Sequence, residues 1–277
     1  MPELPEVEVV KIFLEDKLLG STITDLEILN KKSFIGDPSE VIGQKIVKFT
    51  RIGKQLSIHL SNGKIILVHL KMTGQLIIDG FMLGHPTKTI ETKSTRLIFS
   101  FSNKTKLFFN DQRKFGWVKV YNNNAELAEA QSKLGLDIFD PNFTPDYLYS
   151  QLQRSSRAVK LVLLDQNFFA GIGNIYANDA LFLSNIHPSI PAKEISKVQS
   201  KNIHKNLILI MQQSVLAGGS TMKDNKYVRP DGSYGNNQFS FRVYQRFKEP
   251  CLNCQTPISR ITLGGRGTFF CPKCQPE

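Results

Sequence analysis

The sequence predicts an α+β protein with a β-rich N-terminal half and a helical C-terminal half that ends in a four-cysteine module. Three observations support this prediction. Apolar residues repeat at helical spacing within residues 6–19 and then alternate at strand spacing between residues 56 and 121. The helical period returns after about residue 142, and all the cysteines lie between residues 251 and 274.

The N-terminal half is expected to open with one helix and continue as hairpins. The apolar face of segment 6–19 consists of Val7, Val10, Leu14 and Leu18. Gly20 follows as a helix cap, and the polar run 61–64 is typical of a tight turn. The predicted strands are 56–60, 65–70, 97–101, 107–109 and 117–121. Together they favour a sandwich or a flattened barrel.

The C-terminal half is expected to be helical. The predicted helices are 145–152, 158–164, 177–183 and 195–216, the last of them ended by Gly218 and Gly219. Residues 219–250 are polar and lack a period, which indicates a long loop of the functional or mobile kind. We therefore predict an N-terminal domain over 1–130, a linker within 122–142 and a second domain over 142–277.

The chain is basic, with 35 lysines and arginines against 24 acidic residues, a net charge of +11 and a pI near 9.4. The excess favours a polyanionic partner, nucleic acid before a membrane surface, although a merely basic protein fits it equally well. No apolar run reaches the ~20 residues of a membrane helix. The acidic, proline-broken start is not a signal peptide, so we expect a cytoplasmic protein.

The four cysteines form two Cys-x-x-Cys pairs, Cys251 with Cys254 and Cys271 with Cys274. This spacing is typical of one tetrahedral zinc ion, and a cytoplasmic chain argues against the alternatives of disulfides or a redox pair. Four protein ligands leave no open position for water. The sequence therefore predicts one structural Zn²⁺, and no redox or organic cofactor.

Pro2 is the first candidate for chemistry. Removal of Met1 exposes a secondary amine, and an α-amine with a pKa of ~8 has a neutral fraction near neutral pH. Such an amine can attack a sugar carbon and form an imine. Glu3 and Glu6 beside it can act as acids, or they can simply stabilise a helix start, as can Pro2 with Pro5.

Three further segments allow a functional and a structural interpretation. Gly171–Ala177 opens a helix with glycines, which suits a phosphate or an ordinary helix junction. The turn Asp111–Gly116 carries two cations and Phe115, a combination that suits a wedge into duplex DNA or a solvated turn. Met72 has the same ambiguity between a wedge and a core residue.

Taken in order, these motifs resemble those of bacterial formamidopyrimidine-DNA glycosylases over essentially the whole chain. The resemblance is carried by Met1–Glu8, Gly53-Lys54, His69–Gly74, Arg113–Gly116, Gly171–Ala177 and the four cysteines. It implies an N-terminal helix plus a β-sandwich domain. It also implies a C-terminal helical domain with a helix–two-turns–helix motif, a lesion-recognition loop over 219–240 and a zinc-finger β-hairpin within 245–277, with DNA between the two domains.

The resemblance also implies roles for the site residues. Pro2 corresponds to the Schiff-base nucleophile, Glu3 to the general acid in base removal, and Glu6 to a support of both. Lys54 corresponds to a proton donor in β-elimination, and Arg266 to the arginine of δ-elimination. The implied DNA contacts are Met72, Arg113 and Phe115 in the void left by a flipped nucleotide, and Asn174 and Lys160 at phosphates. Ser220 and Thr221 open the loop over the flipped base.

Several positions depart from the family pattern. Lys93-Ser94-Thr95-Arg96 stands where a Lys-His-Asp-His string is usual, so a DNA-contacting histidine is missing. Arg96 can replace the charge of that histidine but not its pH-dependent switching. Ser156 stands where a DNA-binding lysine is expected, with Arg157 as a substitute. The remaining departures are Gln112, Leu161 and Tyr244–Lys248. None of them affects Pro2 or Glu3.

We therefore expect a monomeric, bifunctional glycosylase and abasic-site lyase of base-excision repair. Its partner is damaged double-stranded DNA, and its substrates are 8-oxoguanine opposite cytosine and formamidopyrimidines. Two alternatives remain open. One is the sister class of endonuclease VIII-like enzymes, which act on oxidised pyrimidines. The other is a non-catalytic zinc-finger DNA-binding scaffold.

Overall fold

The computed structural model of the chain describes residues 1–79, 91–222 and 226–277. The chain divides into two compact units. The first unit consists of Met1–Lys133 and Ser214–Gln238, and the second of Leu134–Gln213 and Phe239–Glu277. Within the described residues, no helix is both long and apolar enough to span a membrane.

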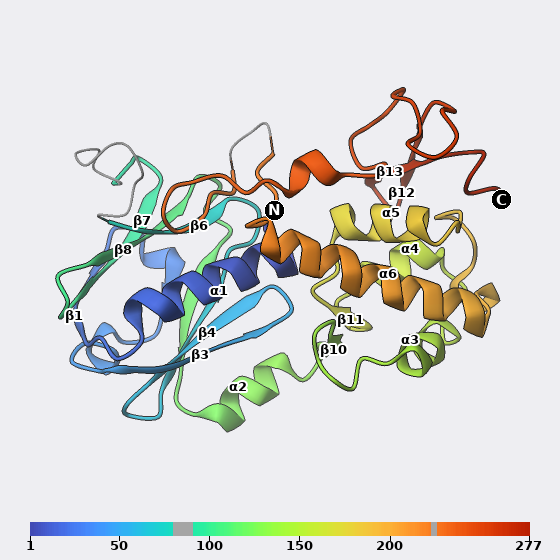
Figure 1. Cartoon of the computed structure of the whole chain (residues 1–277). Helices are drawn as coiled ribbons and strands as arrows, with labels where there is room; N and C mark the ends of the chain where they lie inside the picture. The colour runs from blue at the N-terminus through green and yellow to red at the C-terminus, as the bar shows by residue number, and fades with distance from the viewer. Residues whose placement is uncertain (80–90, 223–225) are drawn as a thin grey trace. The chain divides into compact units, whose positions relative to one another are not determined.

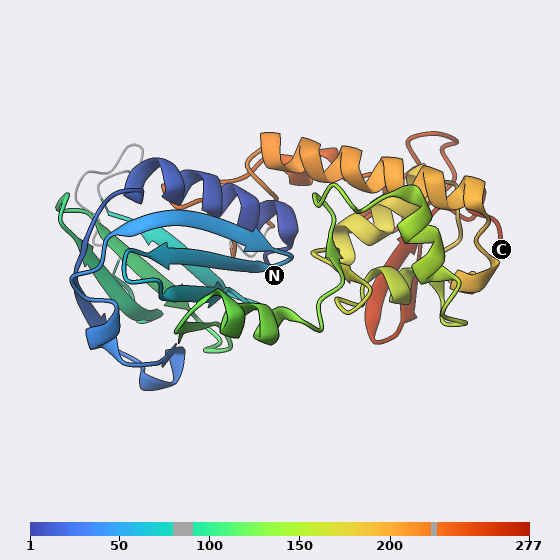
Figure 2. The same ribbon diagram turned by 90° about the horizontal axis from the view of Figure 1, so that it is seen from below.

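The first unit opens with helix α1 (Leu4–Leu18), which lies along strands β3 (Ile46–Ile52) and β4 (Gln55–Leu60), as Figures 1 and 2 show. The predicted apolar face is buried against the sheets, and Gly20 follows the helix with a φ of +81°. Glu3 caps the first turn, and Pro5 occupies an early position where no backbone donor is needed. The start of the chain is therefore fixed by local sequence as well as by packing.

Two sheets form the body of this unit, and their apolar faces share one core with α1. The five-stranded sheet has the order β2-β9-β5-β4-β3, and the four-stranded sheet has the order β1-β7-β8-β6 within the described residues. The strands not yet placed are β1 (Ile23–Ile28), β2 (Phe34–Ile35), β5 (Ile65–His69), β6 (Gly74–Ile78), β7 (Thr95–Phe101), β8 (Lys106–Asp111) and β9 (Trp117–Tyr121). The predicted β-sandwich is confirmed.

Some elements have no counterpart in the prediction. Strands β1, β2, β3 and β6 lie outside the predicted strands, and helix α2 (Asn124–Gln131) lies in the predicted linker. Asn123 caps α2 by accepting the N–H of Glu126. Short 3-10 helices complete the described connections at Lys31–Ser33, Pro38–Glu40, Ala192–Glu194 and Asn237–Ser240.

Strand β6 lies at one edge of the four-stranded sheet, and residues 226–230 run beside it. The side chain of Gln75 donates to the carbonyl of Lys226, and the N–H of Ile78 donates to the carbonyl of Pro230 at 2.8 Å. An exposed strand edge is a site of unwanted pairing, so a covering segment stabilises it. The segment that follows the long helix therefore belongs to the sandwich.

The second unit contains four α-helices within its described residues: α3 (Pro145–Leu152), α4 (Val159–Leu163), α5 (Asn174–Leu183) and most of α6 (Lys197–Leu216). Strands β10 (Leu136–Asp137) and β11 (Phe169–Ala170) pair in parallel. Strands β12 (Ser259–Leu263) and β13 (Arg266–Phe270) form the antiparallel hairpin of the cysteine module. This helical region and its hairpin confirm the rest of the predicted fold class.

Candidate active site

The N-terminal residues are buried where α1 begins. Pro2 is buried, and Glu3 is 4% exposed. The backbone N–H of Glu3 donates to Oε2 of Glu6 at 2.9 Å, and the carboxylate of Glu3 accepts the N–H of Glu6 in return. This reciprocal cap fixes the Glu3 and Glu6 carboxylates at the positive end of the helix dipole, and Pro2 is the residue directly before Glu3 in the chain.

Glu6 also reaches a segment more than two hundred positions away in the sequence. Its Oε1 accepts the N–H of Ser220 at 2.9 Å, and its side chain is 1% exposed. The hydroxyl of Tyr227 lies 3.4 Å from the Glu6 carbonyl and 3.3 Å from that of Gly218. Burial, reinforced by the charge of Glu6, raises the pKa of Tyr227 well above its usual value. One carboxylate therefore joins Glu3 to the start of the predicted lesion loop.

Hydrogen bonds join the beginning of that loop to its end. Oγ1 of Thr221 accepts the N–H of Gly235, and Oγ of Ser220 accepts from the Asn237 side chain, both at 2.9 Å. Gly235 is obligatory because a Cβ there would lie 2.2 Å from the carbonyl oxygen of Gly219. Of the predicted loop 219–240, residues 223–225 lie outside the described residues.

Lys54 lies in the turn between β3 and β4 and is 8% exposed. Arg51 connects this turn to α1, since its Nε is 2.6 Å from Oε2 of Glu8 and its Nη1 donates to the carbonyl of Gly53 at 3.0 Å. Burial opposes ionisation of Glu8, but Arg51 and Lys11 outweigh it and lower the pKa of that carboxyl. An ion pair thus fixes the turn of Lys54 to the helix that carries Glu3.

His69 is the titratable neighbour of Lys54. It pairs with Gln55 across the sheet, and its Nδ1 accepts the N–H of Lys71 at 3.1 Å. Burial, with further contributions from the charges of Lys71 and Lys54, lowers the pKa of His69 to about 3. The ring is therefore neutral at physiological pH.

The three predicted wedge residues lie on two connections of the sandwich. Met72 is 39% exposed and Phe115 is 54% exposed. The guanidinium carbon of Arg113 lies 4.8 Å from the centre of the Phe115 ring, within cation–π range. Arg96 donates from Nε to the carbonyl of Asp111 at 2.9 Å, so its guanidinium supports the same turn.

Three predicted site residues of the second unit belong to the hairpin β12–β13 or contact it. Lys160 is fully buried, and its Nζ donates to the carbonyl of Gly267 at 3.1 Å and to Oγ1 of Thr268 at 2.7 Å. The side chain of Asn174 donates to the same Gly267 carbonyl at 3.1 Å. Arg266, at the start of β13, is exposed. Two polar side chains therefore hold the strand that begins with Arg266.

Arg157 has an acidic partner on its own unit. Its Nη2 lies 2.8 Å from Oδ2 of Asp165, and its guanidinium lies over the ring of Phe168. Because a paired arginine must exchange one anion for another, its attraction for phosphate is weaker than that of an unpaired one.

The four cysteines converge on one point. Their sulfur atoms all lie within 4.8 Å of one another, with separations of 3.9 Å for Cys251–Cys274, 3.4 Å for Cys254–Cys271 and 3.5 Å for Cys254–Cys274. A tetrahedral zinc ion with Zn–S bonds of ~2.3 Å requires sulfur separations of about 3.8 Å. The donor set fits one structural zinc ion, as predicted.

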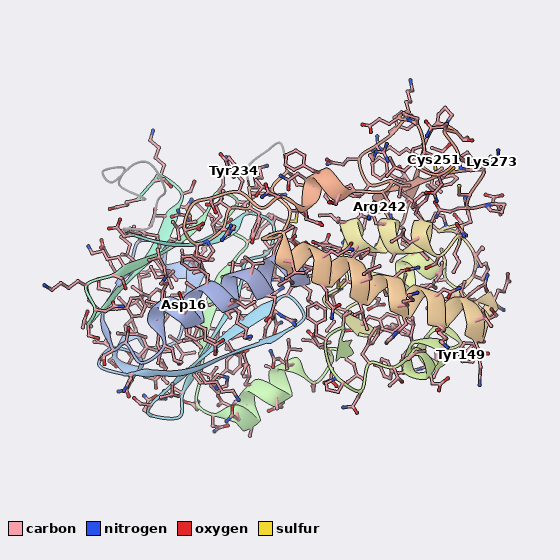
Figure 3. The ribbon with its side chains drawn as sticks, viewed as in Figure 1. Asp16, Tyr149, Tyr234, Arg242, Cys251 and Lys273 are labelled. Atoms are coloured by element: carbon pink, nitrogen blue, oxygen red, sulfur yellow. The ribbon has the colours of Figure 1, made fainter. Side chains whose placement is uncertain are left out.

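Two residues without a sequence signal of their own support this module. Asp179 on α5 accepts the backbone N–H groups of Arg242, Val243 and Tyr244 at 2.9–3.0 Å. These three residues come shortly before Cys251 in the chain, and Figure 3 labels Arg242 and Cys251. Burial raises the pKa of Asp179 despite these hydrogen bonds. Gln275 accepts the N–H of Cys271 and donates to the carbonyl of Ile186. Sequence reasoning missed both because their partners are backbone groups, most of them distant in the chain, which leave no side-chain pattern.

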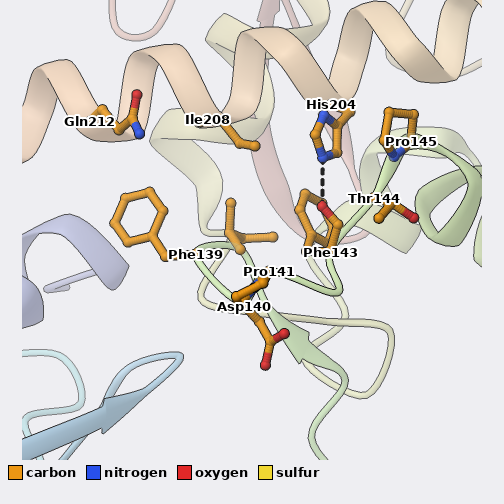
Figure 4. A pocket seen from close by; sticks show the side chains of 10 residues that line it. Phe139, Asp140, Pro141, Phe143, Thr144, Pro145, His204, Ile208 and Gln212 are labelled. Carbon is orange, nitrogen blue, oxygen red and sulfur yellow. Dashed lines mark hydrogen bonds between the residues drawn. The ribbon is translucent and has the colours of Figure 1, made fainter.

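A pocket of about 460 Å³ lies in the second unit between the 138–145 segment and α6 (Figure 4). Phe139, Pro141 and Ile208 supply apolar walls, and Nε2 of His204 lies 2.6 Å from the carbonyl of Phe143. None of the residues predicted for the site lines it. The pocket therefore contributes nothing to the predicted chemistry.

Three family descriptions match the chain in succession. They are the formamidopyrimidine-DNA glycosylase N-terminal domain over residues 1–118, its H2TH domain over residues 134–226, and a zinc finger found in FPG and IleRS over residues 248–276. Among curated proteins, the formamidopyrimidine-DNA glycosylase of Ligilactobacillus salivarius is 38% identical, with 99% of each chain covered. That of Bacillus licheniformis is also 38% identical, with 100% of each chain covered.

Solved structures of the same family also match the chain over its full length. The MutM (Fpg) protein of Thermus thermophilus superposes with a TM-score of 0.89 at 32% identity, over 100% of this chain and 99% of that one. Lactococcus lactis Fpg in complex with abasic-site DNA gives a TM-score of 0.88 at 29% identity, over 100% of both chains. The wild-type L. lactis enzyme with DNA containing N7-benzyl-Fapy-dG gives 0.87 at 30% identity, again over the full length of both.

Proposed function

The chain belongs to the formamidopyrimidine-DNA glycosylase family, and from that premise we propose that it excises oxidised purines and cleaves the resulting abasic strand by β,δ-elimination. Its substrates are 8-oxoguanine opposite cytosine and ring-opened formamidopyrimidines in double-stranded DNA. The observation that carries this proposal is the buried N-terminal cap, in which Pro2 adjoins the Glu3 and Glu6 carboxylates.

The first step removes the base. Once Met1 is cleaved off, the neutral amine of Pro2 attacks C1′ of the flipped nucleotide as the bond from C1′ to the base breaks. Glu3 supplies one proton and the Pro2 N–H the other, one to the departing base and one to the sugar ring oxygen O4′. The C1′–O4′ bond then opens to a 4′ hydroxyl, and a C1′ iminium remains on Pro2. Glu6 holds Glu3 in place through the N–H that it accepts.

The iminium then makes strand cleavage possible. It acidifies the hydrogen on C2′, so that loss of this proton expels the 3′ phosphate and a second elimination expels the 5′ phosphate. Lys54, buried in its turn and fixed to α1 through Arg51, provides the proton transfer linked to the first elimination. Arg266 neutralises phosphate charge in the second. Hydrolysis of the remaining imine returns the Pro2 amine.

Recognition of DNA uses exposed and half-buried side chains of both units. Met72, Arg113 and Phe115 fill the space left by the flipped nucleotide, and Arg113 faces the orphaned cytosine. Asn174 and Arg157 contact phosphates, with Arg96 as a further cation. Lys160 is fully buried, and we assign it to the hairpin that carries Arg266. Ser220 and Thr221 open the segment that covers the flipped base.

Cys251, Cys254, Cys271 and Cys274 would hold a zinc ion that stabilises this hairpin. Four protein ligands would leave no open position, so the ion would supply structure and no proton transfer. We further propose that the enzyme acts as a monomer in the cytoplasm, on the bacterial nucleoid. The net charge of +11 supplies the general attraction to DNA.

Borohydride trapping tests the nucleophile and the lesion class together. Purified protein, with Met1 verified absent, is incubated with a duplex containing 8-oxoguanine opposite cytosine, reduced and mapped by mass spectrometry. We expect a covalent adduct on the peptide that begins with Pro2, and none with Pro2→Gly. An adduct formed only with thymine-glycol DNA would indicate the sister class. The absence of any adduct, even with abasic DNA, would leave a binding scaffold without the chemistry.

A further inference from the structure

Two connections cross from one sheet to the other at the same end of the first unit. Residues 70–73 join β5 to β6, and residues 112–116 join β8 to β9. His69 pairs with Trp117 in one sheet, and Gly74 pairs with Asp111 in the other. The two connections are therefore neighbours at both of their ends, in the five-stranded sheet and in the four-stranded sheet. Met72 consequently lies close to the turn that carries Arg113 and Phe115.

A single buried carboxylate joins the two connections. Asp111 is fully buried, and its Oδ1 accepts from the hydroxyl of Thr73 and from the N–H of Arg113 at 3.1 Å. Its Oδ2 accepts the N–H of Gly116 at 2.6 Å. The Thr73 hydroxyl in turn accepts the N–H of Arg113 at 3.0 Å. The hydroxyl of Thr73 and the carboxylate of Asp111 thus fix the backbone on both sides of the wedge.

The backbone at the tips needs such support. Lys71, directly before Met72, has a φ of 51°, and Lys114, between Arg113 and Phe115, has a φ of 58°. Side-chain-bearing residues adopt these left-handed angles at a cost of about 1–3 kcal/mol, so neighbouring contacts must hold them there. Gly116 admits no side chain either, because a Cβ would lie 2.8 Å from the Phe109 ring.

We propose that Thr73 and Asp111 are positioning residues that lock Met72, Arg113 and Phe115 into one preformed wedge. The wedge then enters the base stack as a unit, without an ordering cost at the moment when the lesion is flipped. The inference rests on the proposed function. It concerns base flipping in duplex DNA, because a single strand has no orphaned base and no opposite stack to fill.

The test compares Thr73→Val, which removes only the hydroxyl, with Thr73→Ser, which keeps it. Single-turnover excision of 8-oxoguanine from a duplex is measured beside borohydride trapping on a single-stranded abasic oligonucleotide. A fluorescent base analogue next to the lesion reports unstacking. We expect Thr73→Val to slow duplex excision about tenfold and to reduce the fluorescence change, whereas Thr73→Ser retains both. Trapping on the single strand should equal that of the wild type.

Three results are distinguishable. Unchanged duplex excision by Thr73→Val would overturn the inference, because the hydroxyl would then be dispensable. Equal losses on duplex and single strand would overturn it as well, because they would indicate a general structural role. Failure of the wild-type protein itself to form an adduct on either substrate would instead refute the proposed function.

Discussion

The two units hold their functional side chains by different means. In the first unit, the buried carboxylates of Glu6 and Asp111 accept N–H groups from chain segments that carry the site. In the second unit, Asp179 uses the same device, but the hairpin of Arg266 also depends on four cysteines with only a small buried cluster around them. A module with so little apolar core needs its metal, whereas the sandwich does not.

Removal of zinc should unfold the cysteine module of the second unit and leave the first unit folded, and this is the largest effect that we expect. Cys271→Ala should release the ion and weaken binding to lesion duplex by about a hundredfold or more, because β13 and Arg266 lose their support. Thermal unfolding of the sandwich, followed through Trp117 fluorescence, should change little. Metal content by mass spectrometry and titration with duplex DNA provide the two measurements.

A matched control for this variant is Asn253→Ala, which lies between the first two cysteines without being a ligand. It should keep both zinc and DNA affinity. Normal DNA binding by zinc-free Cys271→Ala would show that the hairpin is held by Lys160 and Asn174 alone, and the contrast between the two units would disappear.

The carboxylate network of the first unit is tested by Glu6→Gln. An amide cannot accept on both sides, so either the N–H of Glu3 or that of Ser220 loses its buried partner, at a cost of about 1–3 kcal/mol. We expect excision to slow by roughly tenfold to a hundredfold while zinc content stays normal. Glu15→Gln, farther along α1 and more exposed, is the control. Wild-type excision by Glu6→Gln would show that the link to Ser220 does not serve the reaction.

The comparison also explains what the sequence could predict. Strand β4, in which the buried Leu56, Ile58 and Leu60 alternate with other residues, and the long helix α6 follow from the spacing of their apolar residues. Strand β3 does not, because its register shifts between Ile46 and Lys48 and its most buried apolar residues, Ile46 and Phe49, stand three apart. Helix α2 offers only Leu127 and Gln131 as buried positions, too few for a helical pattern.

The residues of the candidate site also divide into those that a local sequence motif indicates and those that no motif indicates. Pro2, Glu3 and the cysteines stand in local motifs, so a sequence can indicate them. Asp111 and Asp179 act by accepting backbone N–H groups, and the residues around them carry no pattern that reveals this. For Asp179, the partners lie more than sixty positions away along the chain. Fold and family are therefore more predictable than the buried residues that support the candidate site.

The smallest effect that we expect is a pH dependence confined to the first unit. The pKa of His69 is about 3 in the folded chain and 6.5 in the unfolded chain. Between these two pH values, the ring is neutral in the folded chain and protonated in the unfolded chain. The stabilising contribution is fully present above pH 6.5 and is lost as the pH falls toward 3. Between pH 7 and pH 5, the free energy of unfolding should therefore decrease by about 1–2 kcal/mol through His69.

Urea denaturation of wild type and His69→Gln at both pH values isolates this contribution, since Glu8, His59 and the other groups titrate in both proteins. Equal decreases in the two proteins would show that His69 is not the source, and its place beside Lys54 would then have no bearing on stability.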